Sequence, residues 1–158
     1  MARQPIQVEG IVFRKPIKVE GIVFRKEDRQ VEFLLLKRTA KRGGFWQPVT
    51  GGVEEGETIS EALKREVNEE TKISNFIQIL EKVHYFELES GSIRRVKSKD
   101  KIKEYVYGVE VSEDQTVEIC PEEHTEFKWC SYEDALGLLR WDTNKTALKK
   151  LHDRIKII

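Results

Sequence analysis

Several features that would direct the protein to a membrane or to nucleic acid are missing. The chain has no run of 18 apolar residues and no signal-peptide pattern after Met1, so neither a membrane span nor a secretion signal is predicted. Its 28 basic residues balance 28 acidic ones, for a net charge of zero. A strongly basic surface for nucleic acid and a polybasic membrane anchor are therefore not expected.

Cysteine is also scarce. Cys120 and Cys130 are isolated and lack metal-binding spacing, which fits reduced thiols in the cytoplasm better than disulfides. His84, His124 and His152 show no zinc-like spacing either, so we expect ordinary surface or packing histidines. The remaining composition, 158 residues with 39% hydrophobic and 35% charged, predicts one compact domain.

A direct repeat occupies the N-terminus. Residues 5–15 read PIQVEGIVFRK and residues 16–26 read PIKVEGIVFRK, so only Gln7 and Lys18 differ. Each copy is rich in Val and Ile and predicts a strand, but one domain needs a single strand there. We assign residues 16–158 to the folded domain, with the second copy in its core. Residues 1–15 are expected to add an edge strand, exchange with a neighbour or be disordered; a duplication without structural role is equally open.

The rest of the chain alternates between strand and helix patterns. Strands are predicted at residues 31–37, 47–50, 77–88, 103–111 and 126–130, and basic loops at 38–44 and 91–101, the second of them mobile. Helices are predicted at residues 60–71, 132–139 (capped by Ser131) and 144–155. Strands that bracket a helix, followed by helices at the end, indicate an α/β (α+β) fold with a mixed sheet between helical layers.

Three acids in the first predicted helix are candidates for metal binding. Glu66, Glu69 and Glu70 are spaced i, i+3, i+4 and share one helix face. Like charges at this spacing destabilise a helix by roughly a few tenths of a kcal/mol per pair. A divalent cation such as Mg²⁺, which prefers carboxylate oxygens, reverses that effect. The alternative is a solvated acidic helix.

The apolar stripe of the same helix favours the metal. Ile59, Leu63 and Val67 repeat at i, i+4, i+8, the pattern of a buried helix face. Glu66 and Glu70 border this stripe and are therefore expected to point inward. Because an unpaired charge is costly inside a protein, inward carboxylates predict a bound cation.

The start of this helix has the composition of an anion-binding turn. Thr58 or Ser60 can serve as N-cap, and Glu61 completes a capping box with Thr58. Glycines precede it at positions 51, 52 and 56. Loop amides beside a helix start favour negative ligands, although glycine loops are also ordinary turns.

Residues 51–73 together fit the pattern G-x5-E-x7-R-E-U-x-E-E-x-G-U, where U is a bulky aliphatic residue. The matching positions are Gly51, Glu57, Arg65, Glu66, Val67, Glu69, Glu70 and Ile73. Lys72 stands where the pattern has Gly, and a left-handed backbone there would cost Lys about 1 kcal/mol. The stretch resembles the box of the Nudix hydrolases. This resemblance implies an α/β/α sandwich and an enzyme that cleaves a nucleoside diphosphate linked to another group.

Residues outside the box resemble one branch of that family. From about Val31 to the C-terminus, the chain is similar to the dihydroneopterin triphosphate pyrophosphohydrolases, which act on a pterin triphosphate of folate synthesis and on some (d)NTPs. The similar positions are Lys37, Arg38, 45–51, Glu123, His124, 127–129, Trp141 and Asn144. Pro48 departs from this branch. Hydrolysis of ADP-ribose, a dinucleoside polyphosphate or capped RNA stays open, as does a non-catalytic nucleotide sensor, although a sensor needs no complete set of acids.

The resemblance also implies metal and catalytic roles. Glu66, Glu69 and Glu70 would hold Mg²⁺, for which Mn²⁺ can substitute, with the carbonyl of Gly51 or of its neighbour Gly52 as a further ligand. Glu123 would be an additional metal ligand or the base; the alternative is a solvent-exposed loop acid. Arg65 would orient Glu57 or Glu66, unless it forms only a surface ion pair of little energetic value.

Substrate contacts follow from the same resemblance. Lys37 and Arg38 could bind phosphates, since guanidinium groups fit phosphate oxygens well; exposed basic residues at a strand end are the alternative. Phe45 or Trp46 would stack on the base or pterin ring unless they pack in the core, and Gln47 and Asn144 complete the expected substrate site. The partner is then a nucleotide or pterin triphosphate, bound by a monomer or a homodimer.

Overall fold

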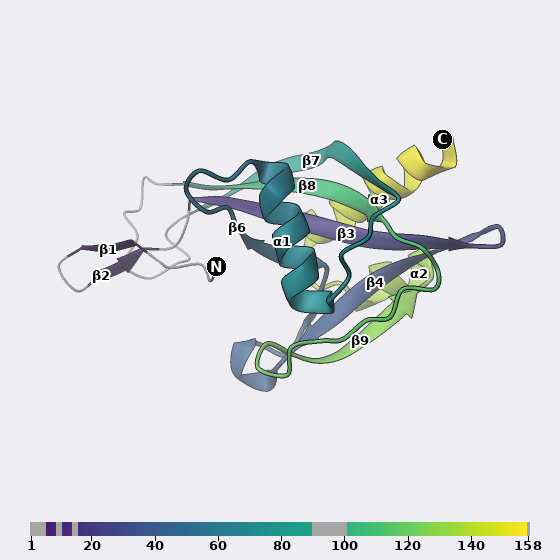
Figure 1. Cartoon of the computed structure of the whole chain (residues 1–158), viewed down its shortest axis with the longest axis horizontal. Helices are drawn as coiled ribbons and strands as arrows, with labels where there is room; N and C mark the ends of the chain where they lie inside the picture. The colour runs from purple at the N-terminus through teal and green to yellow at the C-terminus, as the bar shows by residue number, and fades with distance from the viewer. Residues whose placement is uncertain (1–5, 9–10, 14–15, 90–100, 158) are drawn as a thin grey trace.

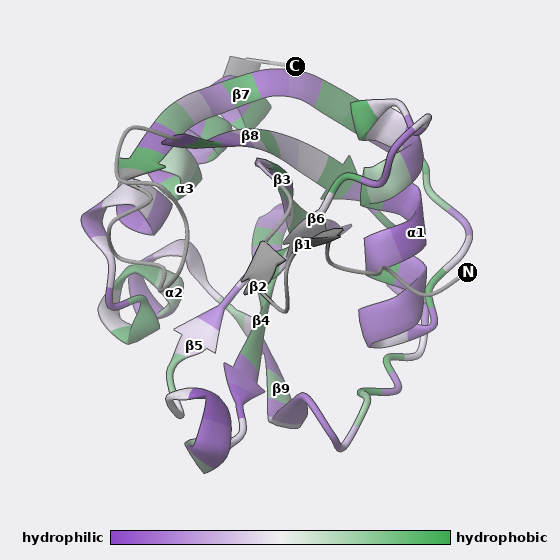
Figure 2. Ribbon diagram, turned by 90° about the vertical axis from the view of Figure 1, so that its left-hand side faces the viewer, coloured by the Kyte–Doolittle hydropathy of each residue, from purple (hydrophilic) through white to green (hydrophobic). Residues whose placement is uncertain are grey.

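The computed structural model describes residues 6–8, 11–13, 16–89 and 101–157. Seven strands form one mixed sheet. Helix α1 (Ile59–Thr71) covers one face, and α2 (Tyr132–Leu138) and α3 (Asp142–Ile157) cover the other (Figures 1 and 2). The predicted α/β/α sandwich with a mixed sheet between helices is confirmed.

Strand β3 is the centre of the sheet. It runs parallel to β8 along one edge, and antiparallel to β6 and then to β4 along the other. β4 also pairs with β5 and β9, and β8 with β7, all antiparallel. The strands are β3 (Ile17–Glu27), β4 (Gln30–Arg38), β5 (Trp46–Gln47), β6 (Val49–Gly52), β7 (Gln78–Glu89), β8 (Lys101–Glu110) and β9 (His124–Cys130).

The alternation of β3 divides the core between its two faces. Val19 and Val23 pack with the residues beneath α1, whereas Ile22 and Phe24 pack with those beneath α2 and α3, because successive side chains of a strand point to opposite faces. Gly21 faces α1, and a Cβ there would lie 2.6 Å from a methyl carbon of Leu63. The missing side chain thus allows α1 to approach the sheet closely.

The two copies of the N-terminal repeat have different structures. The second copy provides most of β3. In the first copy, β1 (Ile6–Val8) and β2 (Ile11–Phe13) pair antiparallel with each other in a separate two-stranded sheet. The described part of the first copy is therefore a pair of short strands and not one strand like the second.

Several predicted boundaries were wrong by a few residues. The strand predicted at 47–50 is two strands, β5 and β6, separated by Pro48, which has no N–H to donate to a sheet. The basic loop at 38–44 contains a 3-10 turn, η1 (Ala40–Arg42), and α3 starts at Asp142, two residues early. Residues 91–100 of the predicted mobile loop lie outside the described residues, and Lys101 already belongs to β8.

Within the described ranges, no helix combines the length and the apolar character that a membrane crossing requires. Cys120 and Cys130 are both free thiols.

Candidate active site and metal centre

A local signal in the sequence determines the start of α1. The Thr58 hydroxyl accepts a hydrogen bond from the Glu61 N–H at 3.1 Å, and the Glu61 carboxylate accepts one from the Thr58 N–H at 2.8 Å. This is the predicted capping box, with Thr58 and not Ser60 as N-cap. At the other end, Lys72 is left-handed with φ 65°. The chain thus keeps the backbone that the usual glycine would favour.

Two of the three box acids are buried. Glu66 is 1% exposed and Glu70 3%, as the apolar stripe predicts, whereas the Glu69 side chain is 41% exposed. Burying a carboxylate is costly unless a partner compensates for its lost hydration. The groups around each acid therefore define the site.

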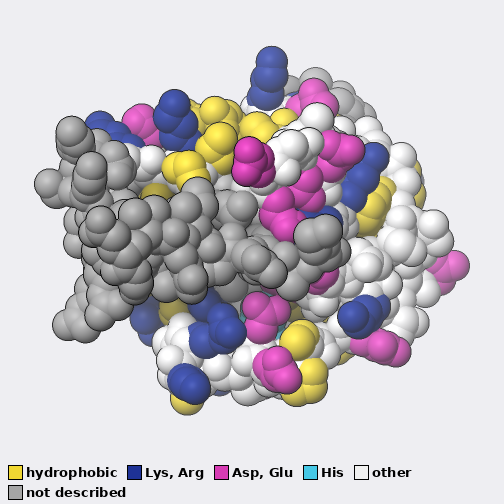
Figure 3. Space-filling model, turned by 60° about the vertical axis from the view of Figure 1, so that its left-hand side comes forward, with side chains coloured by type: hydrophobic (Ala, Val, Ile, Leu, Met, Phe, Trp, Pro, Cys, Tyr) yellow, Lys and Arg dark blue, Asp and Glu magenta, His cyan; other side chains and the backbone are white. Residues whose placement is uncertain are grey.

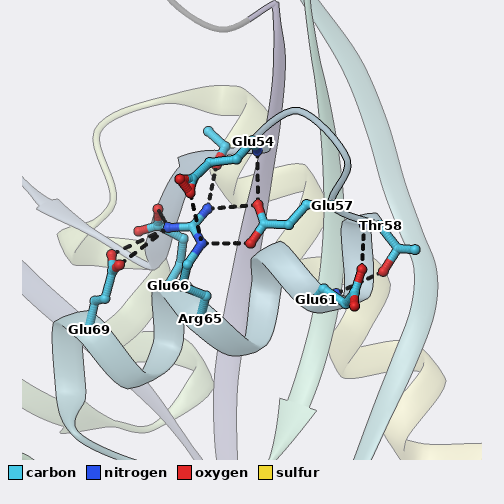
Figure 4. Close-up of polar contacts among 8 residues, drawn as sticks. Glu54, Glu57, Thr58, Glu61, Arg65, Glu66 and Glu69 are labelled. Carbon is cyan, nitrogen blue, oxygen red and sulfur yellow. Dashed lines mark hydrogen bonds and ion pairs between the residues drawn. The ribbon is translucent and has the colours of Figure 1, made fainter. Parts of the chain in front are cut away.

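Arg65 connects the acids to the glycine loop (Figure 4). Its Nε and Nη2 donate to both Glu57 oxygens at 2.7 and 3.0 Å, its Nη1 donates to Glu66 at 2.9 Å, and its Nη2 also donates to the Gly52 carbonyl at 2.9 Å. Glu69 lies 3.4 Å from Nη1. Hydrogen bonds, those to Glu57 above all, raise the pKa of Arg65 further above its high usual value, so the guanidinium is a permanent positive charge among the acids.

Gly51 leaves space for a catalytic candidate. A Cβ at position 51 would lie 2.0 Å from the Glu66 carboxyl carbon, far inside van der Waals contact. The Glu66 carboxyl therefore lies directly over the backbone of β6. Arg65 already uses the Gly52 carbonyl, which leaves the Gly51 carbonyl as the better candidate for a metal ligand.

A buried polar group adjoins Glu70. His124 Nε2 lies 3.8 Å from Glu70 Oε1 and 3.5 Å from Gln47 Nε2, and all three side chains are buried. Burial, followed by the charges of Arg38 and Arg42, lowers the pKa of His124 to about 4. His124 is therefore neutral at pH 7, and its contact with Glu70 is not an ion pair. Gln47, predicted to touch substrate, is buried with its side chain against His124.

Glu123 pairs with a basic residue of the loop after β4. Its carboxylate lies 3.9 Å from Arg42 Nη1, and its side chain is 32% exposed. Its carbonyl accepts from the Thr39 N–H at 3.2 Å, which fixes this loop against the end of β4. Because His124 follows Glu123 in the chain and lies 3.8 Å from Glu70, the backbone of Glu123 adjoins the site, while its carboxylate pairs with Arg42.

The predicted substrate residues form a second group. Phe45 meets Trp141 edge to face with ring centroids 5.9 Å apart, and the Arg38 guanidinium lies 5.4 Å from the Phe45 ring. Trp46 is partly buried against the core beneath α2 and α3. Lys37 Nζ lies 3.6 Å from Glu126. Phe45 is thus placed among cationic and aromatic groups, whereas Trp46 takes the packing role considered as its alternative.

Asn144, also predicted to bind substrate, is buried at the start of α3. Its Nδ2 donates to Glu20 Oε1 at 2.7 Å. Glu20 lies on β3 and is 1% exposed. This contact between the first core strand and the last helix spans 124 positions of sequence.

The donor set fits a hard divalent cation. The available oxygen ligands are two buried carboxylates, the more exposed carboxylate of Glu69 and a backbone carbonyl of β6 at Gly51. Mg²⁺ prefers ligands of this type. Within the described residues, however, no three acidic, histidine or cysteine side chains converge on one point. Glu66 and Glu69 point to Arg65, and Glu70 to His124. Metal binding would thus require at least one of these side chains to change rotamer.

Comparison with known proteins decides the family. The model of the NUDIX domain matches residues 15–152. The chain belongs to the Nudix family. A Listeria monocytogenes protein described as a NUDIX hydrolase has a similar structure, with a TM-score of 0.78, 33% identity, and 90% and 96% of the two chains covered. Like its Nudix relatives, this chain is a hydrolase of phosphorus-containing anhydrides.

Other similar proteins are named for different activities. The mouse bis(5'-nucleosyl)-tetraphosphatase [asymmetrical] is 32% identical over 129 residues, which cover 80% of this chain and 82% of that protein. The Escherichia coli dihydroneopterin triphosphate pyrophosphohydrolase structure has a TM-score of 0.73 at 25% identity, with 89% and 97% covered. A Myxococcus xanthus octanoyltransferase is 31% identical over 121 residues. The chain matches over 77% of its own length but spans only 32% of that protein.

Sequence reasoning missed three residues of the site. Arg42 was assigned only to a basic loop, and Glu20 only to the N-terminal repeat. His124 was expected to be an ordinary histidine, although the resemblance includes it. Glu20 carried a usable signal, because an acid between Val19 and Ile22 in a predicted core strand has to be buried or to break the pattern.

Proposed function

We propose that this Nudix hydrolase is a Mg²⁺-dependent pyrophosphohydrolase of dihydroneopterin triphosphate or a (d)NTP. The observation that carries the proposal is the burial of Glu66 and Glu70 beside Arg65, which holds Glu57 and Glu66 at 2.7 to 3.0 Å; a cation would bind these acids after a change of rotamer. The similarity to the Escherichia coli pyrophosphohydrolase supports the choice of substrate.

The acids and one carbonyl would hold the metal. Glu66, Glu69, Glu70 and the Gly51 carbonyl are the candidate ligands, and Glu123 is a further one if its loop carboxylate leaves Arg42. A metal bound there supplies a Lewis acid for phosphate oxygens and a water of lowered pKa. Arg65 contributes by fixing Glu57 and Glu66, so its role is positioning and not substrate contact.

The chain's own residues then handle the proton and the phosphate charge. Water attacks phosphorus in line, the phosphoanhydride bond breaks, and one of the carboxylates takes the proton from the attacking water. Arg38 and Arg42, whose charges both act on His124, would bind phosphate oxygens. With its pKa lowered to about 4, His124 stays neutral at pH 7 and adds no positive charge that would oppose a cation at Glu70.

A dinucleoside polyphosphate is the second candidate substrate. The mouse relative is named for cleaving a bis(5'-nucleosyl) tetraphosphate asymmetrically, and it is 32% identical over most of both chains. Such a substrate needs the same acids and phosphate contacts. It differs in carrying a second nucleoside at the leaving end.

A substrate panel separates these candidates. The purified protein is incubated with dihydroneopterin triphosphate, the (d)NTPs, diadenosine tetraphosphate and ADP-ribose, each with Mg²⁺ or with a chelator. Metal-dependent release of pyrophosphate from the first two classes supports the proposal. Cleavage of diadenosine tetraphosphate into AMP and ATP, with little pyrophosphate from the others, favours the second candidate. Tight binding without turnover of any compound would identify a nucleotide sensor instead.

A further inference from the structure

A further acid, Glu54, lies beside Arg65 at a position that the pattern of the box leaves open (Figure 4). Its Oε2 is 3.6 Å from Arg65 Nε, and its side chain is 17% exposed, close to the 18% of Glu57. Arg65 is therefore within ion-pair distance of four carboxylates, those of Glu54, Glu57, Glu66 and Glu69.

The guanidinium of Arg65 meets these acids with different nitrogens. On the side of the glycine loop, Glu57 accepts from Nε at 2.7 Å and from Nη2 at 3.0 Å, and Glu54 adjoins Nε. On the side of α1, Nη1 donates to Glu66 at 2.9 Å and to Glu69 at 3.4 Å. The two loop acids and the two helix acids thus contact opposite ends of the same cation.

Metal binding requires the helix acids to leave Arg65. Glu66 and Glu69 are candidate ligands, and their oxygens accept hydrogen bonds from Nη1. A divalent cation that binds these oxygens therefore competes with Arg65 for them. Because hydrogen bonds between ionised groups are strong, this competition weakens cation binding unless other carboxylates keep the guanidinium neutralised.

The turn before α1 places Glu54 and Glu57 for that task. The Glu54 N–H donates to Glu57 Oε1 at 2.8 Å, and the Glu57 N–H donates to the Glu54 carbonyl at 3.0 Å. These bonds keep both carboxylates on the loop side of Arg65. Since both side chains are largely buried, their attraction for Arg65 is screened less than that of a surface pair.

We propose that Glu54 is a positioning residue of the metal site, which holds Arg65 on the loop side and so releases Glu66 and Glu69 to bind the cation. The proposal rests on the proposed function for the presence of that cation. Removing the Glu54 carboxylate has two effects of the same sign: Arg65 pairs more tightly with the helix acids, and the site becomes less negative. Both effects weaken cation binding.

Titrations with Mn²⁺ in the absence of substrate test this directly. Dissociation constants are measured by electron paramagnetic resonance for the wild type, Glu54→Gln and Glu55→Gln. Glu55 is a matched control, because it is the neighbouring acid of the same turn and is exposed. Replacing a residue that supports metal ligands typically weakens binding by roughly 10- to 100-fold. For Glu54→Gln, which is not fully buried, we expect an increase of about 10-fold, and for Glu55→Gln less than about 2-fold.

A second background shows whether Glu54 acts through Arg65. In Arg65→Gln, or in Arg65→Met if the first variant unfolds, the guanidinium that Glu54 holds is absent. Adding Glu54→Gln should then change the Mn²⁺ dissociation constant by less than about 2-fold. An undiminished effect in this background would make Glu54 a direct ligand of the cation and would overturn the positioning role.

The outcomes keep this proposal separate from the proposed function. Weaker Mn²⁺ binding by Glu54→Gln, without hydrolysis of any compound in the substrate panel, would uphold the proposal and refute the proposed function. Mg²⁺-dependent hydrolysis by the wild type, together with equal Mn²⁺ affinities of the wild type and Glu54→Gln, would uphold the proposed function and overturn the proposal.

Discussion

At the scale of single residues, Gly51 is required for space and not for backbone conformation. Because a Cβ there would lie 2.0 Å from the Glu66 carboxyl carbon, Gly51→Ala should displace that carboxylate. Misplacing a reacting group by about 1 Å can cost roughly 100-fold in rate, and we expect a loss of kcat/KM of this order. Gly137→Ala, where an added Cβ meets nothing within 4 Å, is the control. Equal activity of the two variants would show that the Glu66 position does not matter.

Glu70 is predicted to act as a metal ligand and not as part of the core. Glu70→Gln keeps the shape and removes the charge, so hydrolysis should fall by roughly 100-fold or more, while circular dichroism and thermal unfolding stay close to wild type. Glu55→Gln, an exposed acid of the same box, should be nearly as active as wild type. Near-normal turnover of Glu70→Gln would remove Glu70 from the site.

His124 gives the fold a pH dependence whose sign follows from its environment. Its folded pKa of about 4 is below the usual value near 6.5, so the unfolded chain binds more protons between these values. The free energy of unfolding should therefore decrease as pH falls from about 6.5 to about 4, by up to about 3 kcal/mol. Denaturant unfolding at several pH values should show a shallower decrease for His124→Gln. Identical slopes for both proteins would exclude this histidine as the cause.

At the scale of elements, the end of α1 contains a small backbone strain. Lys72 is left-handed, which costs a non-glycine residue about 1 kcal/mol or more. Glycine removes that cost but gains freedom in the unfolded chain, so Lys72→Gly should stabilise the protein by roughly 0.5 kcal/mol. Lys64→Gly, exposed within α1, should instead destabilise it by about 1 kcal/mol. Chemical denaturation measures both changes, and a loss of stability in Lys72→Gly would contradict the strain.

Elements whose signals are local could be predicted from the sequence, and contacts between distant elements could not. The capping box of Thr58 and Glu61 and the inward direction of Glu66 and Glu70 follow from spacing within one helix. The pairing of Glu123 with Arg42 and the contact of Asn144 with Glu20 depend on where the chain returns to the sheet, which no local pattern encodes. For the same reason, the resemblance identified Gln47 as a site residue but could not show that its side chain lies against His124.

At the scale of the whole molecule, the charges match what the composition predicts. Basic and acidic side chains are interspersed on the face in Figure 3, and the net charge is zero. No single-sign field comparable to that of a nucleic-acid-binding protein is expected from such a mixture. Attraction of an anionic substrate therefore depends on local groups such as Arg38 and Arg42.

The repeat allows a test with two deletions that leave nearly the same protein. Removing residues 5–15 or residues 16–26 gives chains that differ at one position, Lys or Gln at the site of Lys18. Because one copy is enough for β3, both chains should fold, with free energies of unfolding within about 1 kcal/mol of each other and with hydrolysis retained. Failure of both to fold would mean that the domain needs two copies.

The central claim is that the acids of α1 bind a divalent cation against a polyphosphate. The most direct measurement is anomalous scattering from crystals grown with Mn²⁺ and a non-hydrolysable substrate analogue. The account predicts an ion bonded to carboxylate oxygens of Glu66 and Glu70 and to an oxygen of the analogue's phosphates. An ion elsewhere in the molecule, or none at all beside these acids, would contradict it.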